Sequence, residues 1–294
     1  MIPLFTRFYK RACIVRIGVA LTIANLDQDG PRISFSISRA NRQDPDTGTI
    51  RLWNLKQETR DAIRLAYTAD DSLRVRLAVG YERVTKVIFD AQAYDVEPGK
   101  FDGPDIVTQL TVGDGVDAYR EGFINESFAP GSELTTPLFA IASAMKLRID
   151  PTSIALYETK ITQSILKATS GPFILQGKAA DSLDVLCAMT GLRWFIRDNT
   201  IVFQDTRAFL DDFAVILSPR TGLLWNEEPH FLDQIKARSL LNPDLQPGRQ
   251  FKLLDEFGRP VGAPAYAIES IRYQGDTHGG VWIADIEEGR AIAT

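Results

Sequence analysis

Strict alternation of apolar and polar side chains most constrains what this chain can fold into. Residues 32–39 read RISFSISR, in which Ile33, Phe35 and Ile37 alternate with serines. Consecutive side chains of a β-strand point to opposite faces, so this run has one face for a core and one for water. The same period of two recurs at residues 13–23 and 73–81, and further strands are expected at 86–96 and 106–112. We therefore expect antiparallel strands with one buried face each.

These strands, with a further one at 49–55, fall within residues 1–115, which we expect to form a small antiparallel β-barrel (tube) domain. One helix is predicted inside it at residues 57–67. Asn54 is expected to cap that helix by accepting from the free amides of its first turn, with Gln57 three residues on.

Residues 116–207 have a different pattern, typical of an α+β insert. One helix is predicted with Thr136 as its N-cap and Pro137 as its first residue. A second helix is predicted at 179–190, ending at Gly191. A hairpin is expected at 192–204, turning at Asp198-Asn199. Strand patterns return over residues 208–294, where we predict a second β-barrel. The fold class is therefore mainly β, with two small barrels flanking a helix-plus-hairpin domain.

Charge and cysteine content exclude several classes of function. The net charge of -5 and pI near 5.2 disfavour a surface that grips nucleic acid, which needs clustered Lys and Arg. Cys13 and Cys187 lie far apart in apolar runs, so we expect buried thiols and no disulfide. The apolar stretch of the basic N-terminus is too short for a signal peptide, and no run has the length of a membrane span. We expect no membrane insertion.

No catalytic, cofactor-binding or metal-binding residue is predicted, and we expect a protein that is not an enzyme and needs no cofactor. The two histidines, His230 and His278, fall in different loops, which disfavours a metal site. In Asp276-Thr277-His278, neighbouring side chains on an extended segment point to opposite faces, so we expect no hydroxyl–imidazole pair. A hairpin turn is expected there instead, in which Asp276 and Thr277 bond the backbone and Gly279 and Gly280 adopt positive φ.

Other residue patterns with possible chemistry have ordinary structural interpretations. Acidic pairs such as Glu287-Glu288 are expected to be solvated surface, and Gly113-Asp114-Gly115 is expected to be a turn with no helix after it. A sugar-stacking platform would need exposed aromatic rings, but each tryptophan lies in or beside a strand pattern, so core or interface packing is expected. The tryptophans are Trp53, Trp194, Trp225 and Trp282.

Two C-terminal loops, Leu240-Leu241-Asn242-Pro243 and Gly275-Asp276-Thr277, together with the order barrel, insert, barrel, resemble a known family. They are similar to the central baseplate hub proteins of contractile-tailed bacteriophages, the late control protein D or tail hub family, which is related to the hub part of type VI secretion spikes. This resemblance implies a homotrimer whose two barrels per subunit form a pseudo-sixfold ring. It implies a structural virion protein of the tail baseplate that is assembled in the host cytoplasm.

The same resemblance implies the partners. These are the tail tube or a tube-initiator protein, a separate trimeric spike protein, and also baseplate wedge proteins and the tape measure protein. DNA would be met only in passage through the ejection channel, and acidic side chains facing that channel would oppose sticking. The alternative hypothesis is a β-rich cell-envelope tail protein that binds or cleaves glycans; a monomer with such activity would support it.

Overall fold

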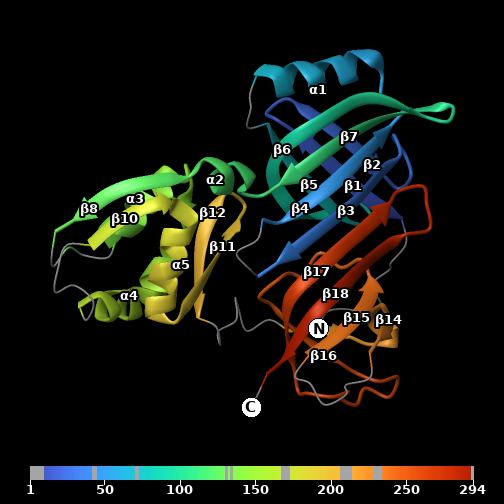
Figure 1. The fold of residues 1–294 in the computed structure, drawn as a ribbon. Helices are drawn as coiled ribbons and strands as arrows, with labels where there is room; N and C mark the ends of the chain where they lie inside the picture. The colour runs from blue at the N-terminus through green and yellow to red at the C-terminus, as the bar shows by residue number, and fades with distance from the viewer. Residues whose placement is uncertain are drawn as a thin grey trace. The chain divides into compact units, whose positions relative to one another are not determined.

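The computed structural model describes residues 10–41, 45–69, 73–129, 132, 135–166, 173–205, 214–227 and 234–292. The chain divides into two compact units (Figure 1). We call Met1–Asn41, Asp46–Gly113 and Phe209–Thr294 the β unit, and Arg42–Pro45 with Asp114–Ala208 the insert unit. The architecture is mostly β with an α+β insert, as predicted.

The described N-terminal part of the β unit contains seven strands and one helix. In chain order the elements are β1 (Arg11–Ile17), β2 (Leu21–Leu26), β3 (Ile33–Ala40), β4 (Thr47–Trp53), α1 (Gln57–Ala69), β5 (Arg74–Tyr81), β6 (Val84–Asp102) and β7 (Asp105–Gly113). The C-terminal strands are β13 (Ala214–Leu217), β14 (Leu223–Asn226), β15 (Gln234–Leu240), β16 (Gln250–Leu253), β17 (Tyr266–Asp276) and β18 (Trp282–Ala291), with a 3-10 turn at Pro219–Thr221 after β13.

Among the described residues, all strands of the β unit belong to one 13-stranded sheet. Its main path runs β14-β15-β18-β17-β3-β4-β7-β6-β5-β1-β2, and β16 joins β13 to β17. The two β regions meet where β17 pairs with β3, from Ser270 opposite Ala40 to Asp276 opposite Ser34. One apolar cluster includes side chains from both regions, among them Ile37, Leu110, Phe251 and Tyr273. The regions predicted at 1–115 and 208–294 are thus joined by a shared sheet and core.

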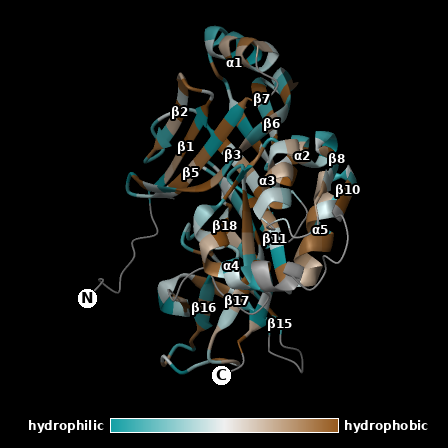
Figure 2. Cartoon of the chain, turned by 90° about the vertical axis from the view of Figure 1, so that its left-hand side faces the viewer, coloured by the Kyte–Doolittle hydropathy of each residue, from teal (hydrophilic) through white to brown (hydrophobic). Residues whose placement is uncertain are grey.

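The predicted alternation is visible along the strands of the β unit. Figure 2 shows hydrophilic and hydrophobic bands following one another along β1 and β5. In β3, Ile33, Phe35 and Ile37 are buried, whereas Ser36 is exposed. Burying one side chain in two gives the sheet an apolar face towards the core and a polar face away from it.

The insert unit has a core of its own. Its elements are α2 (Val116–Glu121), β8 (Phe123–Phe128), α3 (Thr135–Ala144), β9 (Arg148–Ile149), α4 (Pro151–Leu166), β10 (Phe173–Lys178), α5 (Ala179–Thr190), β11 (Leu192–Arg197) and β12 (Thr200–Asp205). Its apolar cluster includes Ile141, Leu183, Trp194 and Phe203. The predicted α5 and the β11–β12 hairpin are present, and Gly191 ends α5 in the left-handed conformation at φ 68°.

Several local predictions for the insert are wrong or incomplete. Helix α3 begins at Thr135, so Thr136 lies inside the helix rather than capping it. Helix α4 and the two-stranded ribbon β8–β10 are not among the predicted elements. The apolar pattern of α4 is interrupted, because the large apolar side chain of Leu156 is exposed. Among the described residues, no helix is both long and apolar enough to cross a membrane.

Asn54 also departs from its prediction. Its backbone has φ 52°, and α1 starts three residues later, at Gln57. The side-chain amide donates to Asp105 Oδ1 at 2.8 Å, and its oxygen accepts from the Ile106 N–H at 3.0 Å. Asn54 therefore fastens the end of β4 to the start of β7 instead of capping the helix.

Candidate functional site

The shared sheet has a polar face that crosses both β regions. Residues opposite each other in an antiparallel ladder share a face. The serines of β3 lie opposite Thr47, Thr49 and Arg51 of β4 on one side and opposite Arg272, Gln274 and Asp276 of β17 on the other. The register extends this face to the outer strands, where the apolar Ile283, opposite Gln274, and Leu240 interrupt the polar side chains. We define the polar face as Ser34, Ser36, Ser38, Thr47, Thr49, Arg51, Asp95, Glu97, Gln109, Thr111, Trp225, Arg238, Arg272, Gln274, Asp276 and Asp285.

The arginines of the polar face are engaged by neighbouring side chains. Arg51 Nε donates to Gln109 Oε1 at 2.8 Å. Arg238 Nε lies 2.5 Å from Asp285 Oδ1. Arg272 Nη2 lies 2.8 Å from Glu287 Oε1, and its Nε donates to the Ser38 hydroxyl at 3.3 Å. A guanidinium bound to a carboxylate is a weaker partner for a phosphate than a free one.

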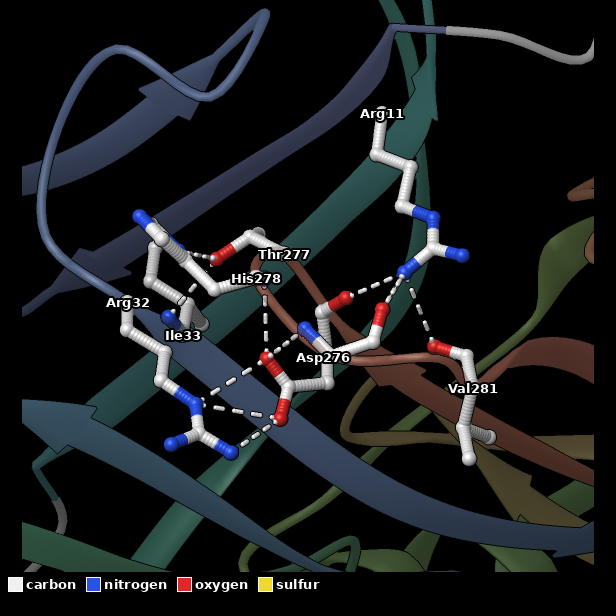
Figure 3. A network of polar contacts seen from close by, with 8 residues as sticks. Arg11, Arg32, Ile33, Asp276, Thr277, His278 and Val281 are labelled. Carbon is white, nitrogen blue, oxygen red and sulfur yellow. Dashed lines mark hydrogen bonds and ion pairs between the residues drawn. The ribbon is translucent and has the colours of Figure 1, made fainter.

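The loop between β17 and β18 carries the densest polar network of this region (Figure 3). Asp276 Oδ1 accepts from the N–H groups of His278 and Gly279, both at 2.9 Å. Arg32, just before β3, donates through Nη2 to Asp276 Oδ2 at 2.7 Å and through Nε to both carboxylate oxygens. Burial raises the pKa of Asp276, but the bonds from Arg32 and from the two backbone N–H groups outweigh it, so the pKa lies below its usual value.

Arg11 binds this loop from the first strand (Figure 3). Its Nη1 donates to the carbonyl oxygens of Asp276, at 2.7 Å, and of Gly279, and its Nη2 donates to the Gly280 carbonyl at 3.1 Å. The guanidinium carbon lies 5.6 Å from the centre of the Trp282 ring. One side chain of β1 thus satisfies several carbonyls of a loop 265 residues or more further along the chain. The sequence pattern does not indicate this contact.

Thr277 and His278 correct one prediction. Thr277 is fully buried, and its hydroxyl accepts from the Ile33 N–H at 3.0 Å. The same hydroxyl lies 3.0 Å from His278 Nδ1, so the expected absence of a hydroxyl–imidazole contact is wrong. The expectation assumed an extended segment, whereas the chain turns here and brings neighbouring side chains to one side. The hydroxyl is committed to the Ile33 amide, which favours a structural role.

The glycines of this loop also differ from their prediction. Neither Gly279 nor Gly280 has positive φ. At Gly279 a Cβ atom would lie 2.7 Å from Asp276 Oδ2, so a larger residue would displace the carboxylate that organises the loop. The predicted backbone bonds to the side chains of Asp276 and Thr277 are confirmed.

The other residues considered for chemistry form no site in the described part of the chain. His278 is exposed, and His230 lies outside the described residues. Within the described part of the chain, no group of His, Cys, Asp and Glu has the arrangement of a metal site. Both cysteines are buried and free, as predicted, and burial raises the pKa of the Cys187 thiol to about 12. Helix α2 follows Gly115, so the prediction that no helix succeeds this turn is wrong.

The tryptophans do not form a stacking platform. Trp53, Trp194 and Trp282 are buried in the structure, as predicted for core residues. Trp225 alone among the four is exposed, by 54%, and it lies on β14 at the end of the sheet. Stacking on a sugar ring requires accessible aromatic faces, which the three buried rings lack.

Comparison with known proteins gives one family and several related folds. The model of the family described as baseplate hub gp41 matches residues 14–284. A search of curated proteins gives no match. The fold is similar to that of the tail protein from Neisseria meningitidis MC58, with a TM-score of 0.61 and 8% identity over 96% of this chain and 97% of that one.

Two further structures have the same fold. The 43 kDa tail protein of prophage MuSo2 from Shewanella oneidensis gives a TM-score of 0.61 and 9% identity, over 96% of this chain and 97% of that chain. The E. coli c3393 protein, described as a component of the type VI secretion system with structural similarity to T4 bacteriophage tail proteins gp27 and gp5, gives 0.58 and 9%, over 95% and 77%. At such identities the likeness concerns the fold.

Proposed function

Because the chain belongs to the baseplate hub gp41 family, we propose that it forms the central hub of a phage tail baseplate as a trimeric ring around the DNA channel. In this proposal the two β regions of each subunit occupy successive positions of a pseudo-sixfold ring. The ring joins the tail tube to a separate trimeric spike, and contacts with wedge and tape measure proteins lie around it. The protein acts by assembly, without a catalytic step.

The polar face supports the channel part of this proposal. It is continuous from one β region into the other across the β3–β17 pairing, as a channel wall built from both regions requires. Proteins that hold DNA do so chiefly through Lys and Arg on phosphates. This face offers hydroxyl and amide groups, with arginines already bound to Gln109, Asp285 and Glu287. A channel wall of this composition would bind the passing DNA only weakly.

Adding positive charge to the centre of the polar face tests the channel. Ser36 and Thr49 lie opposite each other on β3 and β4. We expect Ser36→Lys with Thr49→Lys to slow DNA ejection from assembled tails several-fold at low salt, and added salt to restore the rate because it screens the new charges. The control places lysines at the exposed Ser143 and Thr152 of the insert unit. An unchanged ejection rate in normally assembled tails would exclude this face from the channel wall.

The ring itself is tested by mass and shape. The proposal expects a discrete trimer by light scattering and a ring with a central hole by negative-stain microscopy, for the chain alone or with its spike. A chain that stays monomeric with its spike present and binds or cleaves peptidoglycan would contradict the proposal and favour the glycan-acting alternative.

A further inference from the structure

One row of the polar face carries charges of alternating sign. Reading across the strands, Arg238 of β15 lies opposite Asp285 of β18, and Asp285 lies opposite Arg272 of β17, which in turn lies opposite Ser38 of β3. Residues opposite each other in a ladder share a face, so one carboxylate lies between two arginines. The row by itself has one positive charge in excess.

Asp285 binds the first of these arginines. Arg238 Nε donates to Asp285 Oδ1 at 2.5 Å, and Nη2 donates to Oδ2 at 3.3 Å. The hydrogen bond and the charge of Asp285 raise the pKa of Arg238 above its ordinary value. Both groups reach solvent, since the arginine side chain is 52% exposed and the aspartate 18%. The planar fork of the guanidinium, which also suits a phosphate, is thus already occupied by a carboxylate.

A β-bulge in β18 supplies a carboxylate for the second arginine. Ile286 and Glu288 lie opposite neighbouring residues of β17, which leaves Glu287 as an extra residue between them. Burial alternates along β18 up to this point, whereas Glu287 and Glu288 are both only partly buried, so the bulge turns two successive acidic side chains away from the core. Glu287 Oε1 lies 2.8 Å from Arg272 Nη2. Two carboxylates therefore balance the two cations of the row.

We propose that Asp285 and Glu287 prevent Arg238 and Arg272 from binding the phosphates of DNA that meets this face. This inference rests on the proposed channel and assigns the weak binding of its wall to two named carboxylates. Each phosphate that an arginine neutralises adds affinity that does not depend on sequence, and a guanidinium held by a carboxylate must first give up that contact. Exposed ion pairs contribute little to folding, so the main effect of these two is on the charge that the face presents.

The first test is DNA binding by the purified protein, measured by the fluorescence anisotropy of a short labelled duplex over a range of salt concentrations. We call Asp285→Asn combined with Glu287→Gln the guard variant. We expect it to bind the duplex about tenfold or more tightly than the wild type at low salt. Its affinity should also fall more steeply with salt, by about two in the log–log slope, because two guanidinium groups are freed. An unchanged unfolding temperature shows that the fold persists.

Two controls separate the freed arginines from a change in net charge. Adding Arg238→Gln and Arg272→Gln to the guard variant should return the affinity to that of the wild type. Asp117→Asn with Glu121→Gln is the matched control, because it removes two carboxylates that accept from Arg120 Nη2 in the insert unit, at 2.7 and 2.9 Å, and changes the net charge equally. Equally tight binding by either control overturns the inference, as does a guard variant that binds no more tightly than the wild type.

Assembled tails distinguish this inference from the channel proposal. Tails that carry the guard variant should eject DNA more slowly at low salt, and added salt should restore the rate. If the guard variant binds DNA in solution but its tails eject at the wild-type rate, the role of the two carboxylates stands and the face does not line the channel. If Ser36→Lys with Thr49→Lys slows ejection while the guard variant changes neither binding nor ejection, the channel stands and this inference is wrong.

Discussion

Asp276 shows how a single side chain organises the corner at which the two β regions meet. Its carboxylate orders the loop through the N–H groups of His278 and Gly279 and binds Arg32 through both oxygens. Arg11 binds the carbonyl side of the same loop. The loop therefore receives cations from two N-terminal positions, and its conformation depends on both.

Acidification should weaken this corner. The pKa of Asp276 is lower in the folded protein than in the unfolded chain, where about 3.9 is usual. Its stabilisation is therefore complete above pH about 4 and is lost as the pH falls through the folded pKa. We expect Asp276→Asn to reduce stability at pH 7 and to flatten the fall in stability below pH about 4, measured by urea unfolding at several pH values. Asp29→Asn, an exposed carboxylate, is the control. An equally steep fall in both variants would contradict this role.

We expect Arg11 to contribute to the stability of the β unit through its bonds to the β17–β18 loop. Arg11→Ala leaves the carbonyls of Asp276 and Gly280 without their guanidinium donor. We expect a loss of about 1–3 kcal/mol in the free energy of unfolding of the β unit. Arg16→Ala on the same strand, at an exposed position, should change it by less than about 0.5 kcal/mol. Chemical denaturation compares the two, and equal effects would show that the loop contacts contribute nothing.

At the scale of elements, the β3–β17–β18 junction is held by close packing as well as by backbone pairing. Gly275 of β17 lies opposite Phe35 of β3 and Trp282 of β18. The two rings meet edge to face, with centroids 5.5 Å apart, and a Cβ atom at Gly275 would overlap the Phe35 ring and lie 2.8 Å from Trp282. Position 275 requires glycine because a side chain there would collide with the two rings.

Filling this space should loosen the junction. We expect Gly275→Ala to destabilise the β unit by about 1–3 kcal/mol, because both rings must move within a packed core. Gly280→Ala is the matched control, since a Cβ atom there meets nothing within 4 Å. Thermal unfolding followed by tryptophan fluorescence measures the difference. Equal melting temperatures for the two variants would show that the junction accommodates a methyl group.

At the scale of the whole molecule, the chain has two separate cores. The β unit and the insert unit each contain their own apolar cluster. Leu183 is 1% exposed in the core of the insert unit. Truncating such a side chain costs about 2–5 kcal/mol and acts on the cooperative unit that contains it.

The insert should therefore be destabilised alone by Leu183→Ala. We expect faster amide hydrogen exchange throughout α3, α5 and β11, with protection of β3, β4 and β17 unchanged. Leu77→Ala, fully buried in the β unit, is the reciprocal control and should give the opposite pattern. Loss of protection in both units from either variant would show that they unfold together.

Much of the local structure could be predicted from sequence, because the alternation around Phe35 and the Gly191 cap depend on near neighbours. Asn54 could not be placed, since its side chain binds Ile106 rather than the nearby helix. The contact of Thr277 with Ile33 was equally inaccessible, because it joins residues 244 positions apart. Helix α4 was missed because its buried stripe is narrow.

By itself the sequence determined a mainly β protein with an α+β insert, buried cysteines and serine-rich strands with one polar face, because side-chain periodicity sets which face of a strand can be buried. Only the tertiary structure decided that β3 and β17 pair to join the two regions and that Arg11 and Arg32 bind one loop. It also decided that Trp225, unlike Trp53, Trp194 and Trp282, remains exposed. These features depend on pairing between distant strands, which is selected by the energy of the whole core and leaves no local pattern in the chain.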